Sequence, residues 1–198
     1  MNIPQKSDFL SLSGTALDGI YDEIFSCKEV KLCDFSPNKT MLVVVDVING
    51  FIKEGALGSP SIGVIIPNVK KLMQACEKAA VPVVAFADFH AETSPEFGSF
   101  PKHCLMNTSE CEIVDEIKNC CKYILIKKNS TNGLWEQNFL ALLGANPEIN
   151  EFIVVGDCTD ICVLQFCLSL KAFFNLSDKK CRITIPINAV DTYDFGTH

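Results

Sequence analysis

A cysteine near the start of an expected helix could act as a nucleophile. Cys162 falls in the first turn of a helix expected over residues 160–174, just after a turn that begins at Gly156. Unpaired N–H groups and the positive end of the helix dipole lower the pKa of a thiol there, and the same N–H groups can hold an oxyanion. The alternative is a buried thiol that only packs the helix. Cys158 lies in the turn and Cys167 lies further along the helix, so neither has this position.

Two charged side chains that follow apolar segments could assist this nucleophile. Asp46 ends the apolar run 41–45, where an isolated carboxylate is costly to bury without a partner. It could act as general base to Cys162, or it could cap the following loop. Lys128 also follows an apolar segment, and a lysine beside a carboxylate and a thiolate would stabilise both anions. Lys127 is its rival, because strand alternation sends the two side chains to opposite faces; a solvated lysine is the other alternative.

Carboxylates and imidazoles gather in one segment after residue 87. Two of the three histidines of the chain lie there, and the candidate ligands are Asp88, His90, Glu96 and His103. These residue types suit a zinc, iron, manganese or magnesium-like site with open water positions. Loop histidines that bind no metal are the alternative.

The composition favours one globular domain. Of the 198 residues, 48% are hydrophobic and 21% are charged, which is enough apolar sequence for a core of ordinary size. A net charge of −7 opposes the phosphate backbone, so nucleic acid is set aside as a partner. No apolar run reaches the roughly 18 residues of a membrane span, and the first eight residues lack the regions of a signal peptide. We therefore expect a cytoplasmic protein that does not act on membranes.

The cysteine content fits this compartment. Eleven cysteines are present without a Cys-x2-Cys pair, and a reducing cytosol argues against disulfides. Most of these thiols are expected to be buried.

Strand and helix patterns alternate from residue 41 onward. Strands are expected over residues 41–46, 81–88, 123–127, 152–155 and 182–190, and helices over 67–80, 111–119, 133–143 and 160–174, with Gly144 ending the third helix. This order predicts a three-layer α/β/α domain over residues 39–198 with a mostly parallel central sheet. Residues 1–38 are expected to form an irregular N-terminal arm that could hold a short helix around residues 18–25.

The parallel sheet predicts where the candidate residues meet. Ligands gather outside the carboxyl ends of parallel strands, and this rule places Asp46, Asp88, Lys127 or Lys128, and the segment 156–162 at one edge of the sheet. No G-x-G-x-x-G or G-K-[ST] pattern is present, so the usual phosphate loops are excluded.

Three motifs in this order resemble those of the nicotinamidase and isochorismatase-like cysteine hydrolases. They are Val45-Asp46-Val47-Ile48-Asn49-Gly50-Phe51, then Phe100-Pro101-Lys102-His103-Cys104, then the segment 156–163, which is similar to G-x-x-T-D-x-C-V. The resemblance extends over about residues 40–195.

The resemblance implies a role for each catalytic candidate. Asp46 would be the general base, Lys128 the lysine of the triad and Cys162 the nucleophile. The amides of Cys158 and Cys162 would form the oxyanion hole, with a cis peptide bond at Asp157–Cys158. Lys128 is preferred because it opens a segment similar to the family pattern K-x-x-[YF]-[SN]-[AG]-F.

The resemblance also implies a metal site and a substrate contact. One divalent ion, zinc, iron or manganese, would be bound by Asp88, His90 and His103, with Glu96 as the ligand found in some members. Phe51 would contact the substrate.

Several positions depart from the family pattern. Thr131 replaces an aromatic residue, Leu134 replaces phenylalanine, Asp157 stands where an apolar residue is common, and the sequence shows no final helix. These departures bear on the substrate more than on the chemistry.

The expected reaction is hydrolysis of nicotinamide to nicotinate and ammonia through a thioester at Cys162. Alternatives within the fold are another small amide, a carbamoyl substrate or the isochorismate vinyl ether. The cysteine and the metal ligands weigh against the ether. A non-catalytic interaction domain and a thiol redox sensor are alternatives of a different class. We also predict a homo-oligomer.

Overall fold

A computed structural model of the chain describes residues 5–193. The chain forms two compact units, Met1–Asp34 and Phe35–His198, which we describe separately. The predicted boundary after residue 38 falls inside a 3₁₀ turn of the second unit, η2 (Pro37–Lys39).

The first unit contains one long helix, α1 (Lys6–Phe25), and a 3₁₀ turn, η1 (Leu32–Asp34). The prediction of an irregular arm with a short helix around residues 18–25 is therefore wrong in extent. Serine, glycine and threonine, which are weak helix formers, interrupt the first half of α1 and obscure its apolar period.

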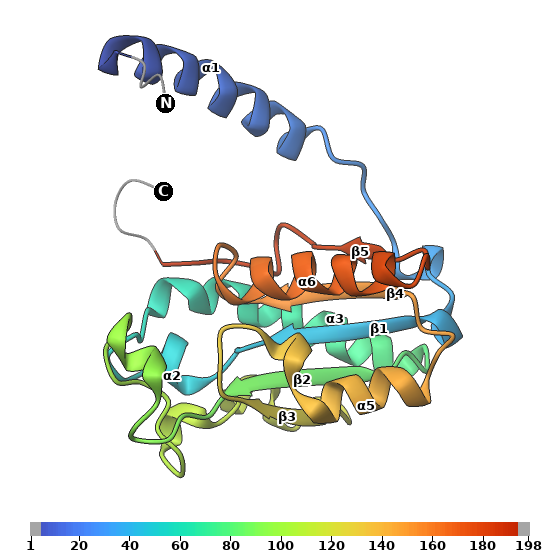
Figure 1. The fold of residues 1–198 in the computed structure, drawn as a ribbon. Helices are drawn as coiled ribbons and strands as arrows, with labels where there is room; N and C mark the ends of the chain where they lie inside the picture. Colours follow the sequence, from blue (N-terminus) through green and yellow to red (C-terminus); the bar gives the residue numbers. More distant parts are fainter. Residues whose placement is uncertain (1–4, 194–198) are drawn as a thin grey trace. The chain divides into compact units, whose positions relative to one another are not determined.

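The second unit is built on a five-stranded, all-parallel sheet. Its strands are β1 (Thr40–Val45), β2 (Val83–Asp88), β3 (Ile124–Lys128), β4 (Glu151–Gly156) and β5 (Arg182–Thr184), in the order β3-β2-β1-β4-β5. Helices α5 (Gln137–Ala145) and α6 (Cys162–Leu176) lie on one face of this sheet and α3 (Ile66–Lys78) lies on the other (Figure 1). The predicted three-layer α/β/α fold with a parallel sheet is confirmed.

Shorter elements connect these layers. They are the helices α2 (Asn49–Ile52) and α4 (Asp115–Lys118) and the 3₁₀ turns η3 (Pro60–Ile65), η4 (Pro95–Gly98), η5 (Ser109–Cys111) and η6 (Gly133–Trp135). Among the described residues, no helix is both long enough and apolar enough to cross a membrane.

Three expected elements differ in extent. The helix expected over residues 111–119 is reduced to the single turn of α4. The helix expected over 133–143, with Gly144 as its end, instead spans Gln137–Ala145, and residues 133–135 form the 3₁₀ turn η6. The strand expected over 182–190 stops at Thr184, since Pro186 has no N–H for a sheet hydrogen bond, and the segment rejoins the sheet only through a bridge between Gly156 and Val190.

Strands β1 and β2 lie inside the buried core of the unit. Every residue of β1 and β2 is buried, as expected for strands that are covered on both faces. Phe86 of β2 packs against Phe139 of α5 and Phe166 of α6, with ring centroids 5.2 and 5.4 Å apart. A buried cluster of this kind fixes the strand ends, and the candidate residues follow those ends.

Candidate active site

The carboxyl ends of three neighbouring strands bring charged side chains together. Asp46 follows β1, Asp88 is the last residue of β2, and Lys128 is the last residue of β3 and the register partner of Asp88. All three side chains are buried, and Cys162 begins α6 beside them. Residues far apart in the sequence therefore share one edge of the sheet.

Lys128 lies at the centre of this group. Its Nζ is 2.8 Å from Asp46 Oδ2 and 3.7 Å from Cys162 Sγ, and it donates a hydrogen bond to Asp88 Oδ1. Burial lowers the pKa of Lys128, but the charges of Asp46 and Asp88 outweigh this and hold the pKa well above its ordinary value. The side chain is therefore an ammonium that neutralises two buried carboxylates.

Lys127 points away from this group. Its side chain is exposed and its Nζ lies 3.7 Å from the centre of the Phe89 ring. The expected alternation of the two lysines along the strand is present, and it places Lys128 rather than Lys127 beside Cys162.

Asp46 has the properties of a general base that works near neutral pH. Burial raises its pKa to about 6, with a further contribution from the charge of Asp88, despite the attraction of Lys128 and hydrogen bonds from Lys128 and Cys162. Its φ of 53° lies in the left-handed region, which non-glycine residues rarely adopt outside functional or strained positions.

Cys162 is a protonated thiol in this site. Burial raises its pKa well above the ordinary value; Lys128 lowers it, and the charges of Asp46 and Asp88 raise it again. The prediction of a thiol with a lowered pKa is therefore contradicted, because that reasoning considered the helix end without the burial and without two neighbouring carboxylates. The proton of Cys162 must move to a base when the sulfur attacks.

A glycine brings the turn before Cys162 close to β1. Gly156 has a φ of 113°, and a Cβ built there would lie 1.9 Å from the carbonyl oxygen of Val45, so no side chain fits. The next residue, Asp157, donates its N–H to that same oxygen at 3.0 Å. This close approach sets the turn beside the end of β1.

The turn carries two amides that are available to a ligand. The peptide bond between Asp157 and Cys158 is cis. Among the described residues, the amides of Cys158 and Cys162 donate no hydrogen bond, whereas Ile161 and Val163 both donate to the carbonyl oxygen of Cys158. Two free amides near one thiol are what an oxyanion hole requires.

Asp157 is a buried carboxyl group without a hydrogen bond from any described residue. Burial, followed by the charge of Asp46, raises its pKa well above the ordinary 3.8. Folding therefore favours the protonated form, so the stability that this group contributes is present below about pH 4 and is lost as the pH rises through the native pKa.

Asp157→Asn should stabilise the protein increasingly as the pH rises, because the amide has nearly the same shape and cannot ionise. We expect the gain to begin as the pH rises above the ordinary carboxyl value of 3.8 and to reach about 1–3 kcal/mol at neutral pH. Urea unfolding of both proteins at each pH measures it. A difference that does not change with pH would contradict the buried, protonated state.

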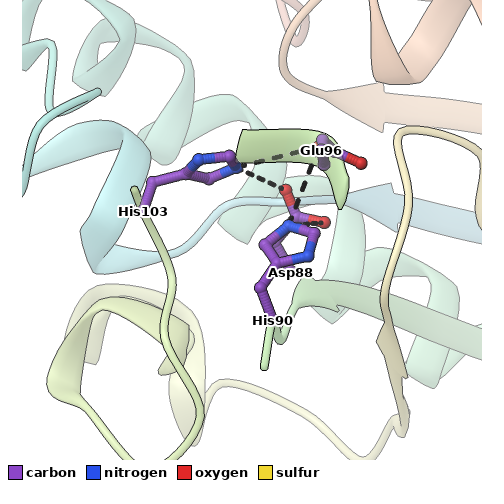
Figure 2. A group of neighbouring side chains, drawn as sticks. All are labelled: Asp88, His90, Glu96 and His103. Atoms are coloured by element: carbon purple, nitrogen blue, oxygen red, sulfur yellow. Dashed lines mark ion pairs between the residues drawn. The ribbon is translucent and has the colours of Figure 1, made fainter. Parts of the chain in front are cut away.

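Next to Lys128, four side chains converge on one point. Asp88, His90, Glu96 and His103 point toward one another in Figure 2, and one potential ligand atom from each lies within 4.8 Å of all the others. Nε2 of His90 is 3.5 Å from Asp88 Oδ1, and Nε2 of His103 is 3.7 Å from Asp88 Oδ2. Glu96 Oε1 lies 3.8 and 3.9 Å from these two nitrogens.

These separations fit a single metal ion. Two ligands that are each about 2.1 Å from an ion at tetrahedral angles lie about 3.4 Å apart, close to the spacing found here. His90 Nδ1 lies 2.9 Å from Asn129 Oδ1, and His103 Nδ1 lies 2.8 Å from the carbonyl oxygen of Pro101. Both acceptors favour a proton on Nδ1, which leaves each Nε2 lone pair directed at the cluster.

A small pocket connects Cys162 with this group of four side chains. Its lining includes Cys162, Cys158, Asp88, Glu96 and His103 together with Phe51, Leu57, Phe100, Thr131, Ile161 and Tyr193. Phe51 was expected at the substrate and lies in this wall. No sequence pattern pointed to Leu57, Ile161 or Tyr193.

Tyr193 reaches the cavity from the C-terminal segment. Asp191 donates its N–H to Gly156 at 3.3 Å and accepts one from Thr159 at 3.0 Å, which fixes this segment against the turn before Cys162. The contact joins residues about 30 positions apart with no periodicity between them, so sequence reasoning had no signal for it.

Comparisons with known proteins identify the family to which this fold belongs. The model of the isochorismatase domain matches residues 40–172. Nicotinamidase 1 of Arabidopsis thaliana is 30% identical over 175 residues, which cover 78% of this chain and 67% of that protein. The chain belongs to the isochorismatase family of hydrolases, and within that family it is similar to a nicotinamidase.

Solved structures share the architecture. The N-carbamoylsarcosine amidase of Thermoplasma acidophilum is 26% identical, with 80% of this chain and 87% of that chain covered and a TM-score of 0.68. The pyrazinamidase of Pyrococcus horikoshii in complex with zinc is 23% identical, with 79% and 88% covered and a TM-score of 0.66, and it shares the fold.

Proposed function

We propose that the protein hydrolyses nicotinamide to nicotinate and ammonia through a thioester at Cys162. The observation that carries this proposal is the position of Lys128, which pairs with Asp46 and Asp88 and lies 3.7 Å from a thiol at the wall of a small cavity. A base, a cation and a nucleophile in one buried group are the components of covalent amide hydrolysis.

The reaction begins with the transfer of the Cys162 proton to Asp46. The sulfur attacks the amide carbon, and the amides of Cys158 and Cys162 hold the resulting oxyanion. Protonated Asp46 then gives its proton to the leaving nitrogen, so the C–N bond breaks, ammonia departs and a thioester remains. Water attacks this thioester after giving a proton to Asp46, and the return of that proton to the sulfur releases the acid and restores the thiol.

The cavity wall favours a neutral amide with a flat ring. Phe51 and Phe100 supply aromatic surface, and none of the described lining residues is lysine or arginine. Lys128 is already paired with two carboxylates, so it offers no free charge to an anionic substrate. This argues against substrates that carry a carboxylate, because burying an unpaired carboxylate is costly.

The competing proposal is hydrolysis of a carbamoyl compound. Two observations favour it: the similarity to N-carbamoylsarcosine amidase, and Thr131 in the wall, where the family pattern has an aromatic residue. A panel of nicotinamide, pyrazinamide and N-carbamoylsarcosine, assayed by ammonia release, separates the two. We expect kcat/KM for nicotinamide to exceed that for the carboxylate-bearing compound by at least about 100-fold. The opposite order would overturn the substrate assignment.

We propose that one divalent ion, zinc, iron or manganese, binds Asp88, His90, Glu96 and His103. When bound, it would anchor a ring nitrogen of the substrate, directly or through water, while attack is left to Cys162. Asp88 would serve both sites, because it contacts the two histidines and also Lys128.

Metal content should depend on these four side chains. We expect about one ion per wild-type chain after incubation with zinc, iron or manganese, and loss of most of it in His90→Ala, since an imidazole ligand is removed. Glu92→Ala is the matched control, because Glu92 is an exposed acid of the same segment that pairs with Lys102. Elemental analysis decides this independently of activity. A wild-type protein that contains no metal after this incubation would contradict the proposal. The metal content of Glu96→Ala tests whether Glu96 is the fourth ligand.

The pH dependence should report the ionisation of Asp46. Only the carboxylate form can accept the thiol proton, and the pKa of Asp46 is raised to about 6, so kcat/KM should fall about tenfold per pH unit below that value. A steady-state profile from about pH 5 to 8, with circular dichroism as a check on folding, measures this. An acid limb near the ordinary carboxyl value of 3.8 would argue against Asp46 as the base.

We also propose a reducing, cytoplasmic compartment. All eleven cysteines lie within the described residues, and all are free thiols.

A further inference from the structure

The helix α1 presents an apolar stripe that is interrupted only by Ser13. Leu10, Leu17 and Ile24 follow one another at intervals of seven residues, and Ser13 and Ile20 lie three positions after the first two. Positions with this spacing share one face of a helix, in the pattern of a coiled-coil seam. The opposite face is polar and carries Asp8, Ser11, Thr15, Asp18 and Asp22.

Within the first unit, nothing covers this stripe. No residue of α1 is buried, and the large side chains on or beside the stripe are each at least 43% exposed: Phe9, Leu10, Leu17, Ile20, Tyr21 and Ile24. Each of these six side chains exposes on the order of 100 Å² of apolar surface. Together they would bury roughly 600 Å² per copy, which is close to the ~800 Å² per partner of a standard interface. An apolar face of this size calls for a partner.

The charges on α1 favour one direction for a pair of these helices. The first turn holds Lys6, the one cation of the helix, together with Asp8, whereas Asp18, Asp22 and Glu23 lie toward the other end. A parallel pair would bring the two acidic ends together. An antiparallel pair separates the two acidic ends, places Lys6 of each helix beside the acidic end of the other and also opposes the two helix dipoles.

We propose that α1 pairs with α1 of a second copy of this chain in an antiparallel two-helix interface. In the register that we propose, a seam residue of one copy faces the seam residue of the other copy whose number adds with its own to 30. This sets Leu10 opposite Ile20, Ser13 opposite Leu17, and Lys6 opposite Ile24 with Glu23 alongside. The small Ser13 opposite Leu17 leaves room for the helices to approach at their centre. This inference does not depend on the proposed substrate.

A membrane surface fits the helix poorly. Helices that lie on anionic lipid carry lysine and arginine on the polar face, whereas α1 has four acidic residues against one lysine. Repulsion by the lipid headgroups would oppose the burial of the stripe.

Analytical ultracentrifugation of the full chain tests the pairing. We expect a dimer for the wild type at about 10–100 μM. Leu17→Glu/Ile20→Glu should raise the dissociation constant of this dimer at least about 100-fold, because four carboxylates would enter the seam. Ser11→Glu/Thr15→Glu is the matched control, since it adds the same charge to the polar face and should leave the dimer intact. Circular dichroism checks that each variant is folded.

The direction of the pair is tested by a charge exchange. Lys6→Glu should weaken the dimer by roughly 2- to 10-fold, as expected for two symmetric, exposed pairs, and adding Glu23→Lys should restore it. In a parallel pair, residue 6 would face residue 6 of the other copy and residue 23 would face residue 23. Adding Glu23→Lys would then not restore the affinity of the dimer.

Three results would overturn the proposal. They are a wild-type monomer at about 100 μM, a dimer that survives Leu17→Glu/Ile20→Glu, and sedimentation of wild-type monomer with phosphatidylcholine–phosphatidylserine vesicles through the same stripe. The first would place the partner of α1 elsewhere, the second would place the dimer interface elsewhere, and the third would identify a lipid-binding helix.

Discussion

Cys162→Ala should abolish ammonia release while the protein stays folded. The sulfur forms the bond to the substrate carbon in the proposed reaction, and no other thiol shares its contact with Lys128 at 3.7 Å among the described residues. Removal of a covalent nucleophile typically costs at least ~10⁴-fold in kcat, so we expect a loss of this size. The assay is ammonia release from nicotinamide under saturating conditions.

Cys167→Ala is the control for this substitution. Cys167 lies in the same helix and is also buried, but it belongs to the hydrophobic core and not to the cavity wall. Its substitution should leave kcat within about threefold, since a thiol-to-methyl change removes one atom from the packing. Turnover that survives Cys162→Ala, or that is lost in a folded Cys167→Ala, would contradict the assignment of the nucleophile.

Lys128→Ala should produce the second large effect, on activity and on stability together. The substitution leaves Asp46 and Asp88 buried without the cation that now lies between them. Breaking a buried ion pair costs about 3–5 kcal/mol, so the free energy of unfolding should fall by this amount. We expect kcat/KM to fall by at least ~10³-fold, because Asp46 would hold its proton and the developing thiolate would lose its neighbouring charge.

Lys127→Ala provides the matched control for Lys128→Ala. Lys127 is the adjacent residue of β3, but it is exposed and contacts the Phe89 ring. Its substitution should change kcat/KM by less than about twofold and stability by at most about 0.5–1 kcal/mol. Steady-state kinetics and chemical unfolding of both variants measure these differences. Equal effects of the two substitutions would show that burial and pairing of Lys128 do not matter for catalysis.

The strands and helices of the second unit could be predicted because the sequence patterns that indicate them are local. The runs that became β1 and β2 are apolar throughout, which is the pattern of strands covered on both faces, and the segments between them have helical periods. Once the sheet is parallel, Asp46, Asp88 and Lys128 must share its carboxyl edge. Alternation along β3 then separates Lys128 from Lys127.

The remaining features depend on tertiary contacts that the sequence does not encode locally. The pKa of Cys162 is raised by burial and by two carboxylates that reach it from other strands, so the helix end alone gave the wrong direction. Tyr193 enters the cavity only because the C-terminal segment pairs with Gly156. The length of α1 was underestimated because weak helix formers fill its first half.

The most direct test of the account is mass spectrometry of the enzyme quenched in acid during turnover of nicotinamide. The account predicts a nicotinoyl group on the peptide that contains Cys162, formed together with one equivalent of ammonia and absent in Cys162→Ala. An adduct-free Cys162 peptide during rapid formation of nicotinate would contradict the account, because hydrolysis would then proceed without a covalent intermediate.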